Sequence, residues 1–323
     1  MDYKPTHFKL PENDTLEKTG DINPYRFTQD IAIALDVALT TNRPLLVAGE
    51  PGSGKSRLAE AIAEVIGWHF LSKTITSRTR LEELTVEMDH LRRMHDAYSV
   101  KDEDNKSRMK QDWVYHNPGI FWWAIDHESA QYRGGNNAEK AKEHGVVVKF
   151  PGKYRTQANG QHNTVLLIDE IDKAEPDLPN DLLEPLDRRS IALPNGEKIS
   201  GKDDNNEDIQ RILTIITTNR ERELPPAFLR RCVSLVLETP RKAQLIEIAG
   251  YHYPEANENR VDAIADRIVK FRGQAKEQAW RAPSTSEFLD AVKACEDFDV
   301  SPNDNDDVWL RIKESVLIKK IDG

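Results

Sequence analysis

The stretch RPLLVAGEPGSGKSRLAEAIAEVIG, residues 43–67, decides the fold of this chain. It begins with a short apolar run, Leu45 to Ala48, that is typical of a buried parallel strand. The next eight residues, Gly49 to Ser56, match the pattern G-x-x-x-x-G-K-[ST]. Apolar residues then recur at helical spacing as far as Gly67, which is a stop signal. A strand, a glycine-rich loop and a helix in this order predict an α/β fold with a phosphate-binding loop.

Each residue type in the loop has a chemical reason to be there. Glycines let backbone amides converge on phosphate oxygens, and the helix N-terminus adds the positive end of its dipole. We expect Lys55 to neutralise the β- and γ-phosphates of a nucleotide, and the Ser56 hydroxyl to ligate Mg²⁺. The predicted nucleotide-binding residues are Gly49, Glu50, Pro51, Gly52, Ser53, Gly54, Lys55, Ser56 and Arg57.

A second stretch, TVLLIDEIDKA at residues 164–174, supplies the acidic groups that such a loop needs. Val165 to Ile168 predict another buried strand, and open parallel sheets place ligand groups at the C-terminal ends of their strands. Asp169 is expected to hold Mg²⁺ through water, and Glu170 to polarise the attacking water. Asp172 and Lys173 are interpreted as solvated turn residues, with contact to a neighbouring subunit as the alternative.

Together the two motifs resemble those of the AAA+ ATPases. RPLLVAGEPGSGKSRLA (43–59), HNPGIFWWAI (116–125) and DLPNDLLEPLDRRSIALPNG (177–196) are similar to the MoxR-type branch, although dynein-related and magnesium-chelatase motor subunits share much of this pattern. The likeness runs from about Tyr25 to Ala294. It implies a P-loop AAA+ module with a central parallel sheet flanked by helices over residues 1–240, with insertions at about 92–162 and 200–210. A small α-helical lid domain is expected over residues 241–323.

The resemblance also assigns roles near LPPAFLRRCVSLVLETP (224–240). Asn219 ends a predicted strand at the family's sensor 1 position. From the residue type alone, an asparagine at the end of a strand would be interpreted as a turn cap. Cys232 to Leu237 predict a strand buried on both faces. Arg231, or alternatively Arg230, is expected to act as an arginine finger in a neighbouring subunit's nucleotide site. A surface ion pair is the alternative for either arginine.

The C-terminal part predicts helices over residues 241–250 and 261–269, and a third beginning at PSTSEF (283–288). Ser284 and Glu287 have the spacing of a capping box at the start of this third helix. The family usually carries its sensor 2 arginine in this turn. Arg281 lies ahead of the proline, so either Arg281 takes this role from a shifted position or the chain lacks such a residue.

Composition restricts the partners. The 323 residues carry a net charge of −10, which argues against broad binding to nucleic acid or to anionic membranes. The sequence has no apolar run long enough for a membrane span, and its start has no leader pattern. With only two cysteines, Cys232 and Cys295, a reduced and cytoplasmic setting is expected.

Other aromatic, charged and histidine residues support less specific interpretations. Trp122 and Trp123 are expected to pack in the core, and residues 101–110 to form a solvated loop. Because His127, His144 and His162 lack tight metal-ligand spacing, no zinc site is expected. The role of the insertion at 92–162 is left open.

The resulting hypothesis is an ATPase that uses ATP and Mg²⁺. ATP is the default because the chain has no Asn-Lys-x-Asp guanine signature. The resemblance implies a ring oligomer, expected as a hexamer, that remodels or assembles a protein client in a chaperone-like way, with von Willebrand A-domain proteins among the candidates. The alternatives are a nucleic-acid motor or loader, and a nucleotide-gated scaffold with little turnover. The sequence does not name the client or pathway, and it does not fix the ring size.

Overall fold

The computed structural model describes residues 5–17, 23–99, 110–134, 138–143, 145–202, 207–278 and 281–318. The chain forms two compact units, each built from separate stretches of sequence. The first unit comprises Met1–Ile33, Val47–Ala61 and Leu235–Gly323, and the second comprises Ala34–Leu46 and Ile62–Ser234. The phosphate loop therefore belongs to the first unit and the acidic motif to the second.

A five-stranded sheet has the strand order β11-β3-β10-β7-β4. Strand β7 pairs in parallel with β10 on one side and with β4 on the other. The inner strands of this sheet are buried along almost their whole length, as the sequence predicted. The predicted α/β fold with a central parallel sheet is confirmed. The strands are β3 (Leu45–Ala48), β4 (His69–Thr74), β7 (Thr164–Asp169), β10 (Ile212–Thr218) and β11 (Val233–Val236).

The prediction that Cys232 to Leu237 form a strand buried on both faces is wrong. Strand β11 stands at one end of the sheet order, so among the described strands it pairs with β3 alone. Ser234 and Val236 are exposed, and Val236 keeps 51% of its surface accessible. An apolar run does not by itself distinguish an edge strand from a central one.

The core of the second unit is built around helix α5 (Ile120–Ile125), and all six of its side chains are buried. Trp122 and Trp123 lie in this core, as predicted. The preceding Gly119 has a steric reason to lack a side chain, because a Cβ atom there would lie 2.4 Å from the backbone of Leu84. Further helices of this unit are α6 (His127–Gln131), α7 (Ala138–Glu143), α8 (Leu178–Asp181), α9 (Leu183–Arg188) and α10 (Pro226–Leu229).

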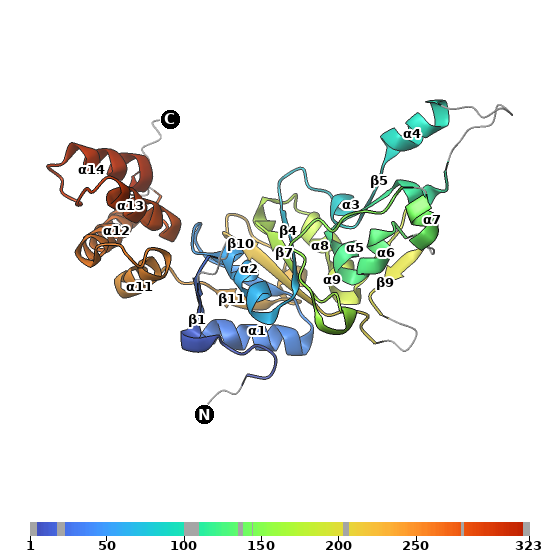
Figure 1. Cartoon of the computed structure of the whole chain (residues 1–323), viewed down its shortest axis with the longest axis horizontal. Coiled ribbons are helices and arrows are strands. Elements are labelled where there is room, and N and C mark those ends of the chain that lie inside the picture. Colours follow the sequence, from blue (N-terminus) through green and yellow to red (C-terminus); the bar gives the residue numbers. More distant parts are fainter. Residues whose placement is uncertain are drawn as a thin grey trace. The chain divides into compact units, whose positions relative to one another are not determined.

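Two small antiparallel pairs of strands also belong to the second unit. Strand β5 (Val86–Met88) pairs with β6 (His116–Pro118), and between them α4 (His90–Ser99) extends away from α5 and α6 (Figure 1). Strand β8 (Ser190–Ala192) pairs with β9 (Lys198–Ser200). The short α3 (Leu81–Leu84) precedes β5. The loop predicted over residues 101–110 lies outside the described residues, apart from Lys110.

The first unit holds the helical C-terminal region. Its helices bury an apolar cluster of their own that includes Phe288 and Trp309. The predicted capping box is confirmed, since Ser284 accepts the Glu287 amide at 3.2 Å and Glu287 accepts the Ser284 amide at 2.7 Å. The helices are α11 (Lys242–His252), α12 (Glu258–Gln278), α13 (Thr285–Asp297) and α14 (Asp307–Ile312), the last followed by a π-helical turn over Lys313–Leu317.

The remaining elements belong to the N-terminal part of the chain. Strands β1 (Thr15–Leu16) and β2 (Tyr25–Arg26) form an antiparallel pair. Helix α1 (Gln29–Thr41) precedes β3, and α2 (Lys55–Ile66) follows the phosphate loop and ends at Gly67, as the sequence predicted. No helix in the described part of the chain is both long and apolar enough to cross a bilayer.

Candidate nucleotide-binding and catalytic site

The phosphate loop connects β3 to α2, and two of its glycines have backbone angles that other residues rarely adopt. Gly52 has φ 73° and Gly54 has φ 88°. A side chain at Gly52 would also collide with Ser284, whose Cβ lies 2.3 Å from the position of a Cβ atom there. The loop therefore needs glycine for its conformation and for its close contact with the start of α13.

Lys55 is the first residue of α2, and its side chain folds back over the loop. Its Nζ donates to the carbonyl oxygens of Gly49 and Glu50, both at 2.9 Å. Only 6% of the residue is exposed. The hydroxyl of Ser53 is also buried, with no hydrogen-bond partner among the described residues. A cation and an unpaired polar atom beside the N-terminus of a 12-residue helix suit a bound phosphate group.

A cavity of about 600 Å³ borders the loop within the first unit. Arg241, Lys242, Arg272 and Arg281 line it together with Glu50 and Pro51. The Arg272 guanidinium donates to the carbonyls of Pro240 and Pro283, and one of its terminal nitrogens is buried without a partner in the described structure. Burial lowers the pKa of Arg272, and the charge of Glu50 opposes that shift.

Sequence reasoning missed Arg272, because it lies in the middle of α12 with no motif around it. Arg281, which was considered, is 62% exposed at its side chain and pairs with Glu287 at 3.5 Å. Four cationic residues therefore line the cavity, and Arg272, which was not predicted, is more buried than Arg281.

Arg57 and Tyr25 connect the loop to the N-terminal segment. Arg57, predicted to bind nucleotide, pairs with Glu60 and donates to the carbonyl of Asn23. Tyr25 approaches Gly54, and burial raises the pKa of its phenol. The structure thus gives Arg57 a structural contact beside the loop.

In the second unit the acidic motif is organised by a residue that sequence reasoning did not single out. The hydroxyl of Thr217, on β10, donates to Asp169 Oδ1 at 2.5 Å. The Thr217 hydroxyl oxygen also accepts a hydrogen bond from the Glu170 amide at 2.9 Å. Glu170 has left-handed backbone angles, φ 60° and ψ 50°, which turn the chain sharply at the end of β7. One buried hydroxyl therefore positions both acids.

Asn219 and Asp172 complete this network. Asn219 Nδ2 donates to Glu170 Oε1 at 3.4 Å, so the predicted sensor residue contacts the predicted base. Asp172 is buried and accepts the amides of Asn219 and Glu221 at 3.1 and 3.0 Å. Its interpretation as a solvated turn residue is wrong, because it fixes the loop that follows β10. Lys173 is exposed and pairs with Glu221.

Replacing Thr217 with valine tests the organising hydroxyl. Valine keeps the branched shape and the strand propensity, so the fold should persist, but Asp169 and Glu170 lose their shared partner. We expect turnover of ATP to fall about 10- to 100-fold, in line with the loss of groups that orient ligands and catalytic side chains. Steady-state hydrolysis would be compared with Thr214→Val on the same strand. Equal rates in both variants would contradict this role for Thr217.

Arg230 and Arg231 follow α10 and are held through their backbone. The Arg43 guanidinium donates to three successive carbonyls, those of Arg230, Arg231 and Cys232. Arg231 pairs with Asp187 of α9, and both side chains are about two-fifths exposed. The surface ion pair that the sequence left open as the alternative is therefore present for Arg231, with Asp187 as its partner. Exposed pairs of this kind contribute about 0–1 kcal/mol, which leaves the arginine able to exchange partners.

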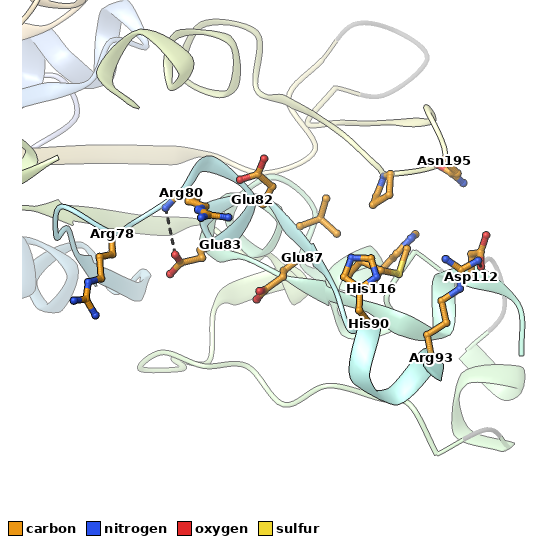
Figure 2. A pocket seen from close by; sticks show the side chains of 13 residues that line it. Arg78, Arg80, Glu82, Glu83, Glu87, His90, Arg93, Asp112, His116 and Asn195 are labelled. Atoms are coloured by element: carbon orange, nitrogen blue, oxygen red, sulfur yellow. Dashed lines mark hydrogen bonds and ion pairs between the residues drawn. The ribbon is translucent and has the colours of Figure 1, made fainter. Parts of the chain in front are cut away.

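Figure 2 shows a larger cavity of about 890 Å³ in the second unit, around α3, β5 and the start of α4. Arg78, Arg80 and Arg93 line it together with Glu82, Glu87 and other acidic groups. Because both signs of charge are mixed along its wall, this cavity lacks the cationic character of the one beside the phosphate loop.

Comparison with protein families matches residues 44–232 to the AAA domain, dynein-related subfamily. The match covers more than half of the 323 residues, and the chain therefore belongs to this family. Members of this class bind nucleotide with a divalent metal, and the fold is that of a P-loop AAA+ protein.

Solved structures similar to this chain include RuvB proteins of Thermotoga maritima. The RuvB Holliday junction branch migration motor is 17% identical, with a TM-score of 0.41 over 87% of this chain and 65% of that one. A mutant RuvB is 16% identical, with a TM-score of 0.45 over 88% and 67% of the two chains. Identities and scores this low say nothing of what this chain acts on.

Proposed function

We propose that this chain is an ATP-hydrolysing ring motor of the MoxR type that remodels or assembles a protein partner. The observation that carries the proposal is the network around Glu170, in which Thr217 holds the Glu170 backbone amide and Asn219 donates to the Glu170 carboxylate. A scaffold that only binds nucleotide has no need of an aligned base. Turnover of ATP by the purified chain, measured with and without Mg²⁺, tests this directly.

The proposed roles of the residues that contact the nucleotide follow from their chemistry. Lys55 neutralises the β- and γ-phosphates, while the loop amides of Gly49 to Gly54 bind the phosphate oxygens. Ser56 and Asp169 would hold Mg²⁺, which supplies charge neutralisation on the phosphates. Glu170 accepts a proton from the attacking water, and Asn219 orients it.

Arg231 is proposed to act in the nucleotide site of a neighbouring subunit, with Arg230 as the alternative. Its guanidinium is two-fifths exposed, and Arg43 fixes the backbone that presents it. The weak pair with Asp187 occupies it in the single chain and releases it to a phosphate, which offers a stronger charge-assisted partner. A trans-acting arginine requires an oligomer, so this proposal includes a ring, for which a hexamer remains our expectation.

Replacing Arg231 with alanine should therefore lower turnover about 10³-fold and leave ATP affinity unchanged, because the arginine acts on charge that develops only in the transition state. Affinity would be measured with a fluorescent nucleotide analogue. Mixing this variant with Lys55→Ala chains should restore part of the activity. The Arg231→Ala chains supply an intact phosphate loop, and the Lys55→Ala chains supply Arg231.

Arg230→Ala and Asp187→Asn are the matched comparisons for Arg231. The first identifies which arginine acts, and the second should not reduce turnover, because it only frees Arg231. No recovery at any mixing ratio, with assembly verified by mass, would count against action in trans.

We propose that the helical C-terminal region contacts the γ-phosphate through a residue of the cavity that Arg272 and Arg281 line. Arg281 was the residue considered from the sequence, in a sensor 2 role. Arg272 is better placed by burial and by its unpaired terminal nitrogen, so we propose it as the residue that takes this role.

A protein client is favoured over a nucleic acid by the surface of α4. Leu91, Met94 and Tyr98 are 82%, 56% and 83% exposed and recur at spacings of three and four, so they share one face of the helix. An exposed apolar stripe suits a protein partner, such as a von Willebrand A-domain protein, better than a phosphate backbone. Stimulation of turnover by DNA or RNA, and not by protein, would favour a nucleic-acid motor instead.

A further inference from the structure

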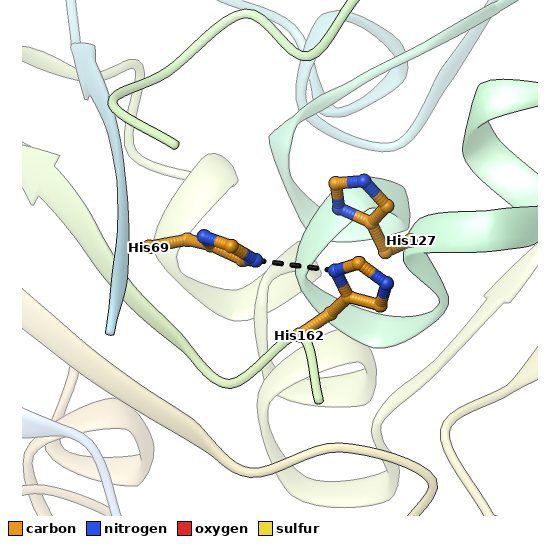
Figure 3. A group of neighbouring side chains, drawn as sticks. All are labelled: His69, His127 and His162. Carbon is orange, nitrogen blue, oxygen red and sulfur yellow. Dashed lines mark hydrogen bonds between the residues drawn. The ribbon is translucent and has the colours of Figure 1, made fainter. Parts of the chain in front are cut away.

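Three histidines from distant parts of the sequence meet in the second unit. His69 is the first residue of β4, His127 is the first residue of α6, and His162 lies two residues before β7. His69 and His127 are buried and His162 is half-buried. Their ligand nitrogens all lie within 4.8 Å of one another. Figure 3 shows that one nitrogen of each ring faces the same space.

The hydrogen bonds define which nitrogen carries the proton on His69. The Arg155 amide donates to His69 Nδ1 at 3.0 Å, so the ring proton is on Nε2. That Nε2 lies 3.2 Å from His162 Nδ1 and donates to it. His127 stacks on His162 with ring centroids 4.0 Å apart and planes 3° apart. His127 Nδ1 is buried and has no hydrogen-bond partner among the described residues.

An unpaired buried nitrogen is costly, and a phenylalanine would fill the same stacked position without that cost. A histidine at this position therefore indicates that His127 Nδ1 binds a ligand. Burial lowers the pKa of both His69 and His127 to about 4, and the pKa of His162 is lowered for the same reason. These shifts favour the uncharged ring, which is the form that ligates metals.

We propose that His69, His127 and His162 bind one transition-metal ion of the zinc class, with a fourth position left for water. Zinc is four-coordinate, with Zn–N distances of about 2.0–2.1 Å, which places its nitrogen ligands about 3.3 Å apart. The 3.2 Å between His69 Nε2 and His162 Nδ1 already has this spacing. Imidazole is the ligand that such ions prefer, and half-buried His162 gives them access.

Binding requires three local adjustments. The ring of His127 must tilt out of its stack with His162, since parallel rings cannot direct their lone pairs to one point. The proton of His69 moves from Nε2 to Nδ1 as the metal takes Nε2, so no proton is lost. Because Nδ1 then donates, the Arg155 amide must turn away from it. The ion would thus tie together the start of β4, the start of α6 and the segment before β7.

Zinc binding by the full-length chain tests the proposal. Chelator-treated protein, without nucleotide or magnesium, would be titrated with zinc chloride against a chromophoric chelator, and bound zinc would be counted by mass spectrometry. We expect one zinc per chain. His127→Phe and His162→Phe keep the aromatic packing and should lower the affinity at least about 100-fold. His95→Phe, at an exposed histidine of α4, is the matched control and should bind like the unmodified chain.

A second measurement on the unmodified chain does not depend on any variant folding. Zinc should shift the ring ¹⁵N resonances of His69, His127 and His162 and leave those of His95 and His116 in place. The proposal is overturned if these resonances do not move, or if folded His127→Phe and His162→Phe chains still bind one zinc with unchanged affinity.

Discussion

Replacing Glu170 with glutamine should leave ATP binding intact and lower turnover by about 10²- to 10⁴-fold, the range supplied by a general base. Glutamine has the same shape but cannot accept a proton from water. The contact with Thr217 uses the backbone amide of Glu170, so the substitution does not disturb it. Asn219 can still donate to the remaining side-chain oxygen. The acidic network should therefore keep its geometry and lose only the carboxylate that accepts the proton.

Because hydrolysis stops while ATP stays bound, this variant should also accumulate the assembled ring. Its mass would be measured by light scattering with and without ATP, and proteins that copurify with the trapped form would be identified. Glu175→Gln, at an exposed carboxylate five residues further along, is the matched control and should hydrolyse ATP normally. Hydrolysis by the Glu170 variant at the rate of the unmodified chain would remove Glu170 from the role of base.

Replacing Lys55 with alanine should abolish productive nucleotide binding. A hydrogen bond from a charged donor contributes about 1.5–3 kcal/mol, which corresponds to a loss of about 10- to 100-fold in affinity for each such contact. Lys55 is expected to contact two phosphate groups, so the loss of affinity should be at least 100-fold. The alanine variant also releases the carbonyls of Gly49 and Glu50, which Lys55 now contacts.

Calorimetric titration with ATP and Mg²⁺ measures this effect, and Lys198→Ala, at an exposed lysine of β9, is the control. The two variants should melt at similar temperatures, because α2 remains capped by the same loop. ATP affinity and turnover that survive the loss of Lys55 would mean that the nucleotide is bound elsewhere.

Local patterns were enough to predict much of this chain. Strand β3, the loop and helix α2 follow from neighbouring residues, because apolar periodicity and glycine spacing are properties of a short segment. The capping box at Ser284 was predicted for the same reason. By contrast, β11 was assigned to the interior, since the order of strands depends on contacts between segments far apart in the sequence.

The contacts of the site residues also depended on the fold. Thr217 lies 47 residues beyond Glu170, and Asp187 lies 44 residues before Arg231, so no local motif links either pair. Asp172 is buried only because the loop after β10 folds over it.

The sequence by itself therefore determined the class of fold, the phosphate loop and the acidic pair, since each is written in a run of adjacent residues. Only the tertiary structure decided which groups share a hydrogen bond, which arginine lines the cavity beside the loop, and that His69 joins His127 and His162. The physical reason is that hydrogen bonds and ligand sets depend on distances in space, and those distances are set by the packing of strands and helices.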